Sequence, residues 1–249
     1  MTNTDAVLTL EIAGQQVEVI RKKIKNLHVG VYPPEGHVRV AAPPSVSLDA
    51  IRHAVLTRLA WVKRKQREFR RQARETPREF VSGETHYVFG RPCRLEVQKG
   101  TARPKMELTP GGRLLMRCKP DADLQARSEQ MSRWYRRVLR KKTAPRVEKW
   151  AKRLGVERSD WGIRRMKTKW GSCNPKKGKI WINLELAKKP SPCLDYVILH
   201  EMTHFISPRH DELFLTTLEQ HMPGWRQVRS DLNAFPLAHE PSFENYTGK

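Results

Sequence analysis

No apolar run in this 249-residue sequence approaches the roughly 20 residues needed to cross a bilayer. The sequence also opens without the charged-then-apolar leader typical of exported proteins. Its four cysteines form no Cys-x-x-Cys pair, which argues against a cysteine-based structural zinc site and suits a reducing compartment. We therefore expect a cytoplasmic protein with no membrane partner, in which at least three of the cysteines are small buried thiols. The four are Cys93, Cys118, Cys173 and Cys193.

Acidic residues are scarce relative to basic ones. The sequence has 26 Asp and Glu against 48 Lys and Arg, a formal net charge of +22. Such an excess attracts polyanions, so nucleic acid or nucleotides are possible partners, although charge alone selects no particular anion. No helix-turn-helix, zinc-finger or RNA-recognition signature is present, and sequence-specific reading of nucleic acid is not expected. The sequence indicates no oligomeric state.

The stretch Leu199–Phe205 contains a His-Glu-x-x-His box in a helical context. Residues four apart lie on one face of a helix, so His200 and His204 can bind one metal ion. Glu201 would lie beside the water that this metal polarises, where a general base belongs. The opposite face repeats apolar residues at helical spacing and is expected to face a core. These residues are Leu194, Ile198, Met202 and Phe205.

A zinc hydrolase needs a third protein ligand and an open position for water. His210 follows the helix-stopping pair Ser207-Pro208, at the spacing of the three-histidine metzincin pattern, except that Ser207 replaces the usual glycine. Glu212 and Glu219 are alternatives, since some zincins take a glutamate from a following helix. We favour His210 and keep Glu219 as the second choice.

Alternating residues over 7–20 and 27–40 predict two strand pairs, and a helical pattern capped by Ser47 follows. Further strand-like pieces continue to residue 116. The sequence therefore predicts an α+β protein whose N-terminal domain, over residues 1–119, is a small antiparallel β-rich unit with a helix inserted over 47–75.

The remaining residues, 120–249, are predicted to form a mainly helical domain with a short sheet and the metal helix. The helical pattern over 122–154 contains Pro145, which should kink or split the helix, and Gly155 is a plausible stop. Clean alternation from Lys179 to Leu186 predicts a strand. A strand pair beside the metal helix could hold an extended peptide as an additional strand.

Two further groups of residues could contact a substrate. A developing oxyanion could be stabilised by Arg209, Tyr196 or Asn183. Basic residues immediately before Trp170-Gly171-Ser172 could instead gather phosphate oxygens near the metal, which would favour hydrolysis of a phosphate ester or anhydride. This basic group is Arg164, Arg165, Lys167 and Lys169.

Residues 169–214, with Lys169–Cys173, the box in Leu194–Phe205, and His210 followed by Phe214, resemble the YgjP-like metallopeptidase domain, which is related to SprT-type and other small zincins. In the N-terminal half, Val40–Pro43 and the Ala60-Trp61-Val62 run are similar to the same family. The resemblance implies a zincin-like, minigluzincin-type C-terminal domain. It also implies one Zn²⁺ per chain, bound by His200, His204 and His210, with Glu201 as catalytic base.

The leading prediction is a zinc-dependent metallopeptidase that acts on peptides or proteins. Two alternatives stay open: a metal-dependent hydrolase of nucleotides or phosphate esters, and a basic nucleic-acid-associated protein in which the zinc site has a secondary role.

Overall fold

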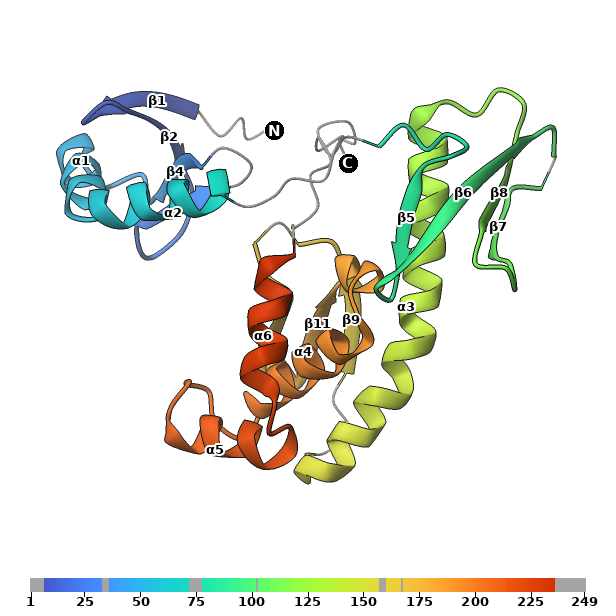
Figure 1. Cartoon of the computed structure of the whole chain (residues 1–249). Helices are drawn as coiled ribbons and strands as arrows, with labels where there is room; N and C mark the ends of the chain where they lie inside the picture. Colours follow the sequence, from blue (N-terminus) through green and yellow to red (C-terminus); the bar gives the residue numbers. More distant parts are fainter. Residues whose placement is uncertain are drawn as a thin grey trace. The chain divides into compact units, whose positions relative to one another are not determined.

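The computed structural model describes residues 7–32, 36–71, 78–101, 103–156, 160–166 and 168–235. The chain forms two compact units, Met1–Arg74 and Glu75–Lys249 (Figure 1). The sequence predicted a boundary near residue 119, whereas the units divide near residue 74. The reason is that the strands of residues 85–118 share one hydrophobic core with the helices that follow them.

The first unit is a four-stranded sheet with two helices. The strand order is β1-β2-β4-β3, and the two outer pairs are antiparallel while β2 and β4 are parallel. The prediction of a purely antiparallel sheet was therefore wrong for the central pair. Ile51, Val55 and Val62 of the helices are buried in a core with the sheet valines. The elements are β1 (Val7–Ile12), β2 (Gln15–Arg21), β3 (His28–Tyr32), β4 (His37–Ala42), α1 (Leu48–Thr57) and α2 (Leu59–Arg71).

The second unit begins with a sheet of the same design. Its order is β5-β6-β8-β7, again with antiparallel outer pairs and a parallel central pair. After each sheet comes a helix whose first three residues read Leu-x-Ala. In both cases a proline stands three positions before the N-cap of that helix. The Ser47 and Asp123 side chains accept the N–H groups of Ala50 and Ala126. The chain thus contains two copies of one ββββα module. The second comprises β5 (Thr85–Val88), β6 (Arg91–Lys99), β7 (Lys105–Leu108), β8 (Leu114–Cys118) and α3 (Leu124–Leu154).

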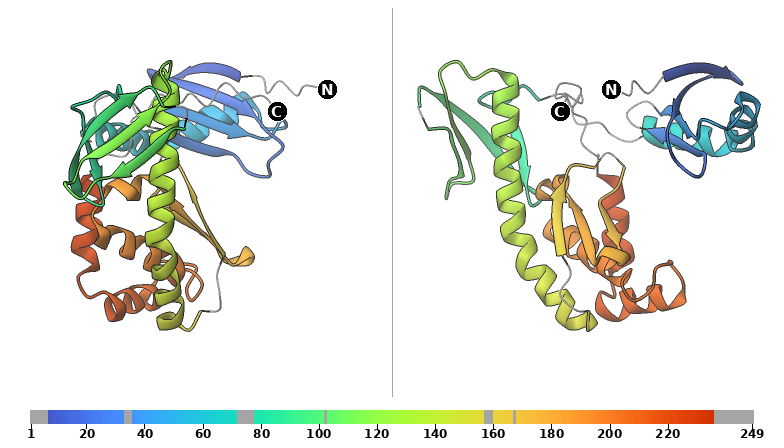
Figure 2. Two further views of the ribbon diagram at one scale, coloured as in Figure 1. Left: turned by 90° about the vertical axis from the view of Figure 1, so that its right-hand side faces the viewer. Right: turned by 180° about the vertical axis from the view of Figure 1, so that it is seen from behind.

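The helix α3 joins this second sheet to the rest of its unit, as Figures 1 and 2 show. Near its start, Tyr135 donates its hydroxyl to the Tyr87 carbonyl of β5 over 2.8 Å. Arg136 donates to the Ile163 carbonyl of the strand β9 (Asp160–Arg164) over 2.5 Å. Pro145 lies inside α3 without dividing it, so the predicted split does not occur, and Gly155 ends the helix at φ 63°.

A third, three-stranded sheet lies beside the helix that carries His200 and Glu201. Its order is β10-β11-β9, with β10 antiparallel and β9 parallel to the central β11. The strand predicted over 179–186 ends early, because the Asn183 side chain accepts the Glu185 N–H and begins a 3₁₀ helix, η2 (Leu184–Lys188). The strands are β9 (Asp160–Arg164), β10 (Gly171–Asn174) and β11 (Lys179–Asn183), with a short 3₁₀ helix, η1 (Pro175–Lys177), between the last two.

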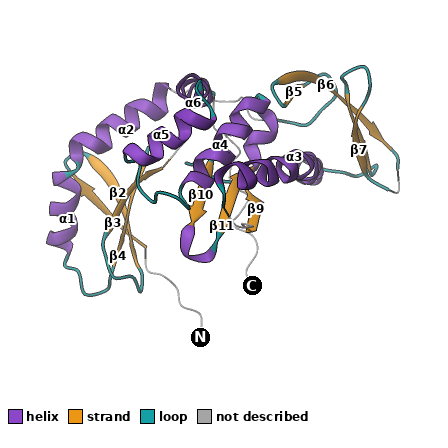
Figure 3. Ribbon diagram, turned by 90° about the horizontal axis from the view of Figure 1, so that it is seen from below, coloured by secondary structure: helices purple, strands orange, loops and turns teal. Residues whose placement is uncertain are grey.

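The helix α4 (Ser191–Thr203) is central to the second unit. It packs against α3, β10, β11 and the two following helices, α5 (Glu212–His221) and α6 (Trp225–Ala234) (Figure 3). Leu194, Ile198 and Met202 are fully buried, as predicted for the apolar face, whereas Phe205 lies beyond the end of the helix and is only partly buried against the same core. Cys93, Cys118 and Cys193 are buried, as predicted for small core thiols. Among the described residues, no helix is both long and apolar enough to span a membrane.

Candidate metal centre

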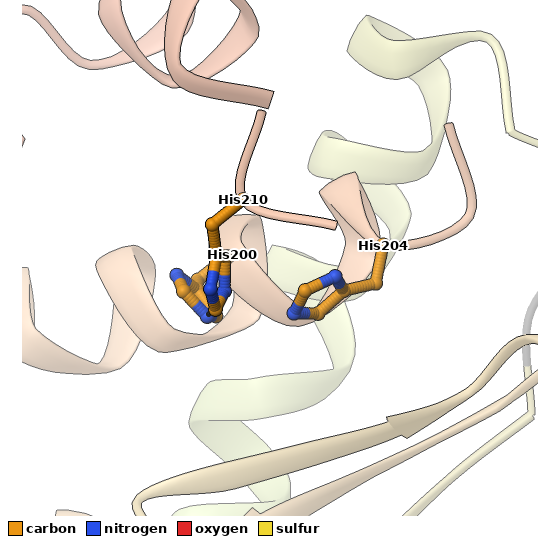
Figure 4. Close-up of side chains that lie close together, drawn as sticks. All are labelled: His200, His204 and His210. Atoms are coloured by element: carbon orange, nitrogen blue, oxygen red, sulfur yellow. Dashed lines mark hydrogen bonds between the residues drawn. The ribbon is translucent and has the colours of Figure 1, made fainter. Parts of the chain in front are cut away.

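Three histidine rings converge at the C-terminal end of α4 (Figure 4). His200 lies in the last turn of α4, His204 is the residue that caps its end, and His210 comes from the loop before α5. One ring nitrogen from each lies within 4.8 Å of the other two, and the Nε2 atoms of His200 and His210 are 3.2 Å apart. Nitrogens bound to one tetrahedral zinc lie about 3.3 Å apart, since each Zn–N bond is about 2.0 Å long. The His200–His210 pair already has this spacing, and three imidazole nitrogens are the kind of donor set that holds zinc.

Two of the rings are held in the neutral form that a metal ligand requires. Burial, with smaller contributions from the neighbouring His204, His210 and Arg229, lowers the pKa of His200 to about 3. Burial also lowers the pKa of His204, although its contact with the Ser207 carbonyl opposes the shift. Both imidazoles are consequently uncharged near neutral pH and offer a lone pair to a cation.

Groups behind the rings orient them. The Nδ1 atom of His204 lies 3.2 Å from the Ser207 carbonyl oxygen, to which it donates as an N–H, leaving Nε2 for a metal. The Tyr196 hydroxyl lies 3.4 Å from Nδ1 of His200. Phe214 of α5 supports all three rings, with its centroid 4.6 to 5.0 Å from theirs. These contacts fix which nitrogen of His204 faces the centre.

The loop that carries His210 is closed by Ser207, the residue that replaces the metzincin glycine. Its buried hydroxyl lies 2.8 and 2.9 Å from the two carboxylate oxygens of Asp211 and 3.1 Å from the Arg209 carbonyl. Asp211 also accepts the Phe214 N–H as the N-cap of α5. That N–H and the Ser207 hydroxyl hold the pKa of Asp211 below its ordinary value. Ser207 therefore links the residues on either side of His210.

Replacing Ser207 by alanine is expected to weaken zinc binding by about tenfold or more, because the loop that carries His210 loses its link to Asp211. The dissociation constant is measured by competition with a chromophoric chelator. Thr216→Ala serves as the matched control, since the Thr216 hydroxyl donates to the Glu212 carbonyl of its own helix, outside the site. Equal zinc affinity for Ser207→Ala and Thr216→Ala would contradict a positioning role for Ser207.

Glu201 is buried against the third sheet. Burial raises the pKa of its carboxyl to about 7, and the positive charge of Lys169 opposes this rise. The backbone of β10 passes so close that a Cβ on Gly171 would lie 2.6 Å from Oε1 of Glu201. Only glycine at position 171 allows this approach. The carboxyl is therefore confined between α4 and β10, next to the histidines.

A cleft of about 600 Å³ opens onto the three rings and Glu201. One part of its wall is the segment Thr168–Cys173, which includes most of the edge strand β10, and another is formed by Arg229, Leu232 and Asn233 of α6. Tyr196 and Val197 of α4 complete the region beside the histidines. The cleft is large enough for several residues of a peptide.

The other residues predicted to contact a substrate differ in whether they line the cleft. Of these, Lys169 lines the cleft, and Lys167 lies outside the described residues. Asn183 is fully buried and bonds backbone groups, including the Met166 and Lys169 carbonyls. Arg164, Arg165 and Arg209 do not line the cleft.

Glu212 and Glu219, the alternative third ligands, do not belong to the histidine cluster. Among the residues that the structure describes, that cluster consists of His200, His204 and His210. Glu219 is bound instead by the indole N–H of Trp225, at 3.0 Å, and by Arg226. Glu212 lies in the first turn of α5, outside the cleft. Arg229, which does line the cleft, was missed because nothing in the sequence placed α6 beside the histidines.

Comparison with known proteins places this geometry in a family context. The model of the YgjP-like metallopeptidase domain matches residues 25–235. No curated protein matches the chain at a significant level. Among solved structures, the chain is similar to the metallopeptidase zymogen abylysin of Pyrococcus abyssi, with 20% identity and a TM-score of 0.35 over 36% of this chain and 90% of abylysin. It is also similar to the metallopeptidase zymogen jannalysin of Methanocaldococcus jannaschii, with 22% identity and a TM-score of 0.34 over 36% of this chain and 86% of jannalysin. The family match runs from β3 to the end of α6 and includes the whole site.

Proposed function

The chain belongs to the YgjP-like metallopeptidase family, and from this membership we propose that it is a zinc-dependent peptidase with a zincin-like centre. The observation that carries the proposal is the convergence of three imidazoles beside a buried carboxylate. In this reading His200, His204 and His210 hold the metal, and Glu201 is the general base.

A zinc ion held by three neutral imidazoles would polarise the scissile carbonyl and lower the pKa of a water molecule to roughly 7. Glu201 would accept a proton from the water that attacks the carbonyl carbon and would return it to the departing amine. The raised pKa of Glu201, about 7, suits a group that must both accept and return a proton near neutrality. The narrow space between α4 and Gly171 keeps its carboxyl from turning away.

The edge strand β10 gives the substrate a place to bind. Within the described residues β10 pairs with β11 alone, and its residues Gly171 to Cys173 line the cleft. An extended peptide can add to this edge as a further strand through main-chain hydrogen bonds. Such a peptide would pass close to Glu201, because a Cβ on Gly171 would lie only 2.6 Å from that carboxylate.

Metal removal tests the proposed function. Dialysis against a strong chelator is expected to abolish cleavage of a mixed-sequence peptide library, and one equivalent of Zn²⁺ per chain should restore it, because the site has one set of ligands. Cleavage is followed by mass spectrometry of the new termini. Magnesium added to the apoprotein is the control, since a cation that prefers oxygen ligands should not occupy three imidazoles. Undiminished cleavage after chelation would refute the proposal.

The phosphate-ester alternative receives less support. It relied on a basic group before Trp170, and of its described members only Lys169 lines the cleft. Arg164 lies over the Trp181 ring at 5.1 Å, and Arg165 donates to the Ser132 hydroxyl. Nucleotides and phosphate diesters incubated beside the peptides, with the same chelator control, decide between the two chemistries.

A further inference from the structure

Few charged side chains line the cleft beside the histidines. Among the residues that the structure describes, they are Lys169, Glu201 and Arg229. Glu201 is buried and belongs to the chemistry already assigned. The accessible charges that a substrate would meet are therefore both positive, and a bound zinc ion would add to them.

Arg229 is placed by α6. It follows Trp225 by one helical turn, so both side chains project from one face of the helix, and the Trp225 ring stacks on Tyr196 of α4 at 6.2 Å. Arg229 lines the cleft together with the three histidines. Its guanidinium therefore belongs to the α6 wall of the space onto which the three rings open.

Lys169 approaches from the other element of the wall. It immediately precedes Trp170 and β10, and it lines the same cleft as Glu201. Within the described part of the chain, neither Lys169 nor Arg229 has a hydrogen-bonded or ion-paired side-chain partner. Arg226, on the same helix as Arg229, is by contrast paired with Glu219. The two cations of the cleft thus remain available to a ligand.

We propose that Arg229 and Lys169 form a carboxylate-binding subsite, so that the cleft selects peptides with a carboxylate close to the scissile bond. This inference rests on the proposed peptidase function and adds the substrate class. A guanidinium binds a carboxylate through two parallel hydrogen bonds, and the ammonium of Lys169 adds a second attraction. The carboxylate is that of an Asp or Glu side chain or of the peptide C-terminus.

Binding to a variant that cannot cleave separates this inference from the proposed function. The test uses the full chain carrying Glu201→Gln, loaded with zinc, and short fluorescent peptides of otherwise neutral sequence. One series carries Glu or Gln at each position in turn with an amidated C-terminus, and another compares the free and amidated C-terminus. Dissociation constants come from fluorescence anisotropy. We expect a Glu peptide or the free C-terminus to bind about tenfold more tightly than its neutral counterpart.

Variants that each remove one positive charge identify the residues responsible for the preference for a carboxylate. In the same background, Arg229→Gln is expected to reduce the preference to near parity and Lys169→Gln to reduce it in part, whereas Arg226→Gln should retain it in full. Thermal melting confirms that each variant is folded. Equal binding of charged and neutral peptides, no binding of either, or a preference that survives in the Arg229→Gln, Lys169→Gln double variant would overturn the subsite. So would an equal loss in Arg226→Gln, which would indicate a bulk charge effect. A wild-type protein that cleaves none of these peptides would count against the peptidase function, while the binding result would still decide the subsite.

Discussion

Replacing Glu201 by glutamine is expected to leave zinc bound and to lower the rate of peptide cleavage at least about a hundredfold. Glutamine has nearly the same shape and fits the space beside Gly171, but it cannot take a proton from water. Loss of a general base commonly costs two to four orders of magnitude. Because Glu201 projects into the cleft without belonging to the imidazole cluster, metal content should not change.

The measurement pairs the cleavage rate with zinc content determined by elemental analysis of the same preparation. Glu212→Gln is the matched control, since Glu212 is an exposed glutamate in the first turn of α5 and lies outside the cleft. It should cleave at the wild-type rate. A Glu201→Gln variant that keeps its zinc and also cleaves at the wild-type rate would remove Glu201 from the mechanism.

The second large effect concerns the third ligand. His210→Ala is expected to lose most of its zinc on dialysis, whereas Glu219→Ala should retain about one ion per chain. The imidazole of His210 lies 3.2 Å from that of His200, while Glu219 is occupied by Trp225 and Arg226. Zinc content after dialysis against a weak chelator distinguishes the two variants.

His53→Ala controls for loss of an exposed histidine, because His53 lies on α1 in the first unit. Full zinc occupancy in His210→Ala, together with loss in Glu219→Ala, would show that Glu219 supplies the ligand and that the last turn of α5 rearranges when metal binds. Loss in both variants would indicate that Glu219 supports the site through Trp225, whose ring stacks on Tyr196.

The site was more predictable than its surroundings. The positions of His200 and Glu201 follow from helical periodicity, and the Ser207-Pro208 break indicates where the chain turns back toward His210. The placement of Arg229 depends on how α6 packs against α4, a long-range contact with no local signal. The prediction that Asn183 contacts a substrate failed for a related reason. A polar residue at a strand end can either face a cleft or bond buried backbone groups, and Asn183 bonds backbone groups.

The fold shows the same division between local and long-range information. The cap at Ser47 and the stop at Gly155 were predicted because each is a local hydrogen-bonding or backbone preference. The parallel pairing of β2 with β4, and the position of the unit boundary, depend on contacts between distant segments. One signal was available and overlooked: Pro44 and Pro120 each precede a capped Leu-x-Ala helix start, which marks the repeated module.

Because the module occurs twice, its two copies can be compared within one chain. In the first copy the helix after the sheet ends at Thr57, whereas in the second it continues unbroken to Leu154. The additional turns are those that run alongside α4, and Arg146 within them bonds Asp195 of α4 over 3.1 Å. The features that both copies share, such as the strand order and the capped helix start, belong to the fold of the module itself. The longer helix of the second copy is thus the difference that gives α4, the helix that carries His200, a partner to pack against.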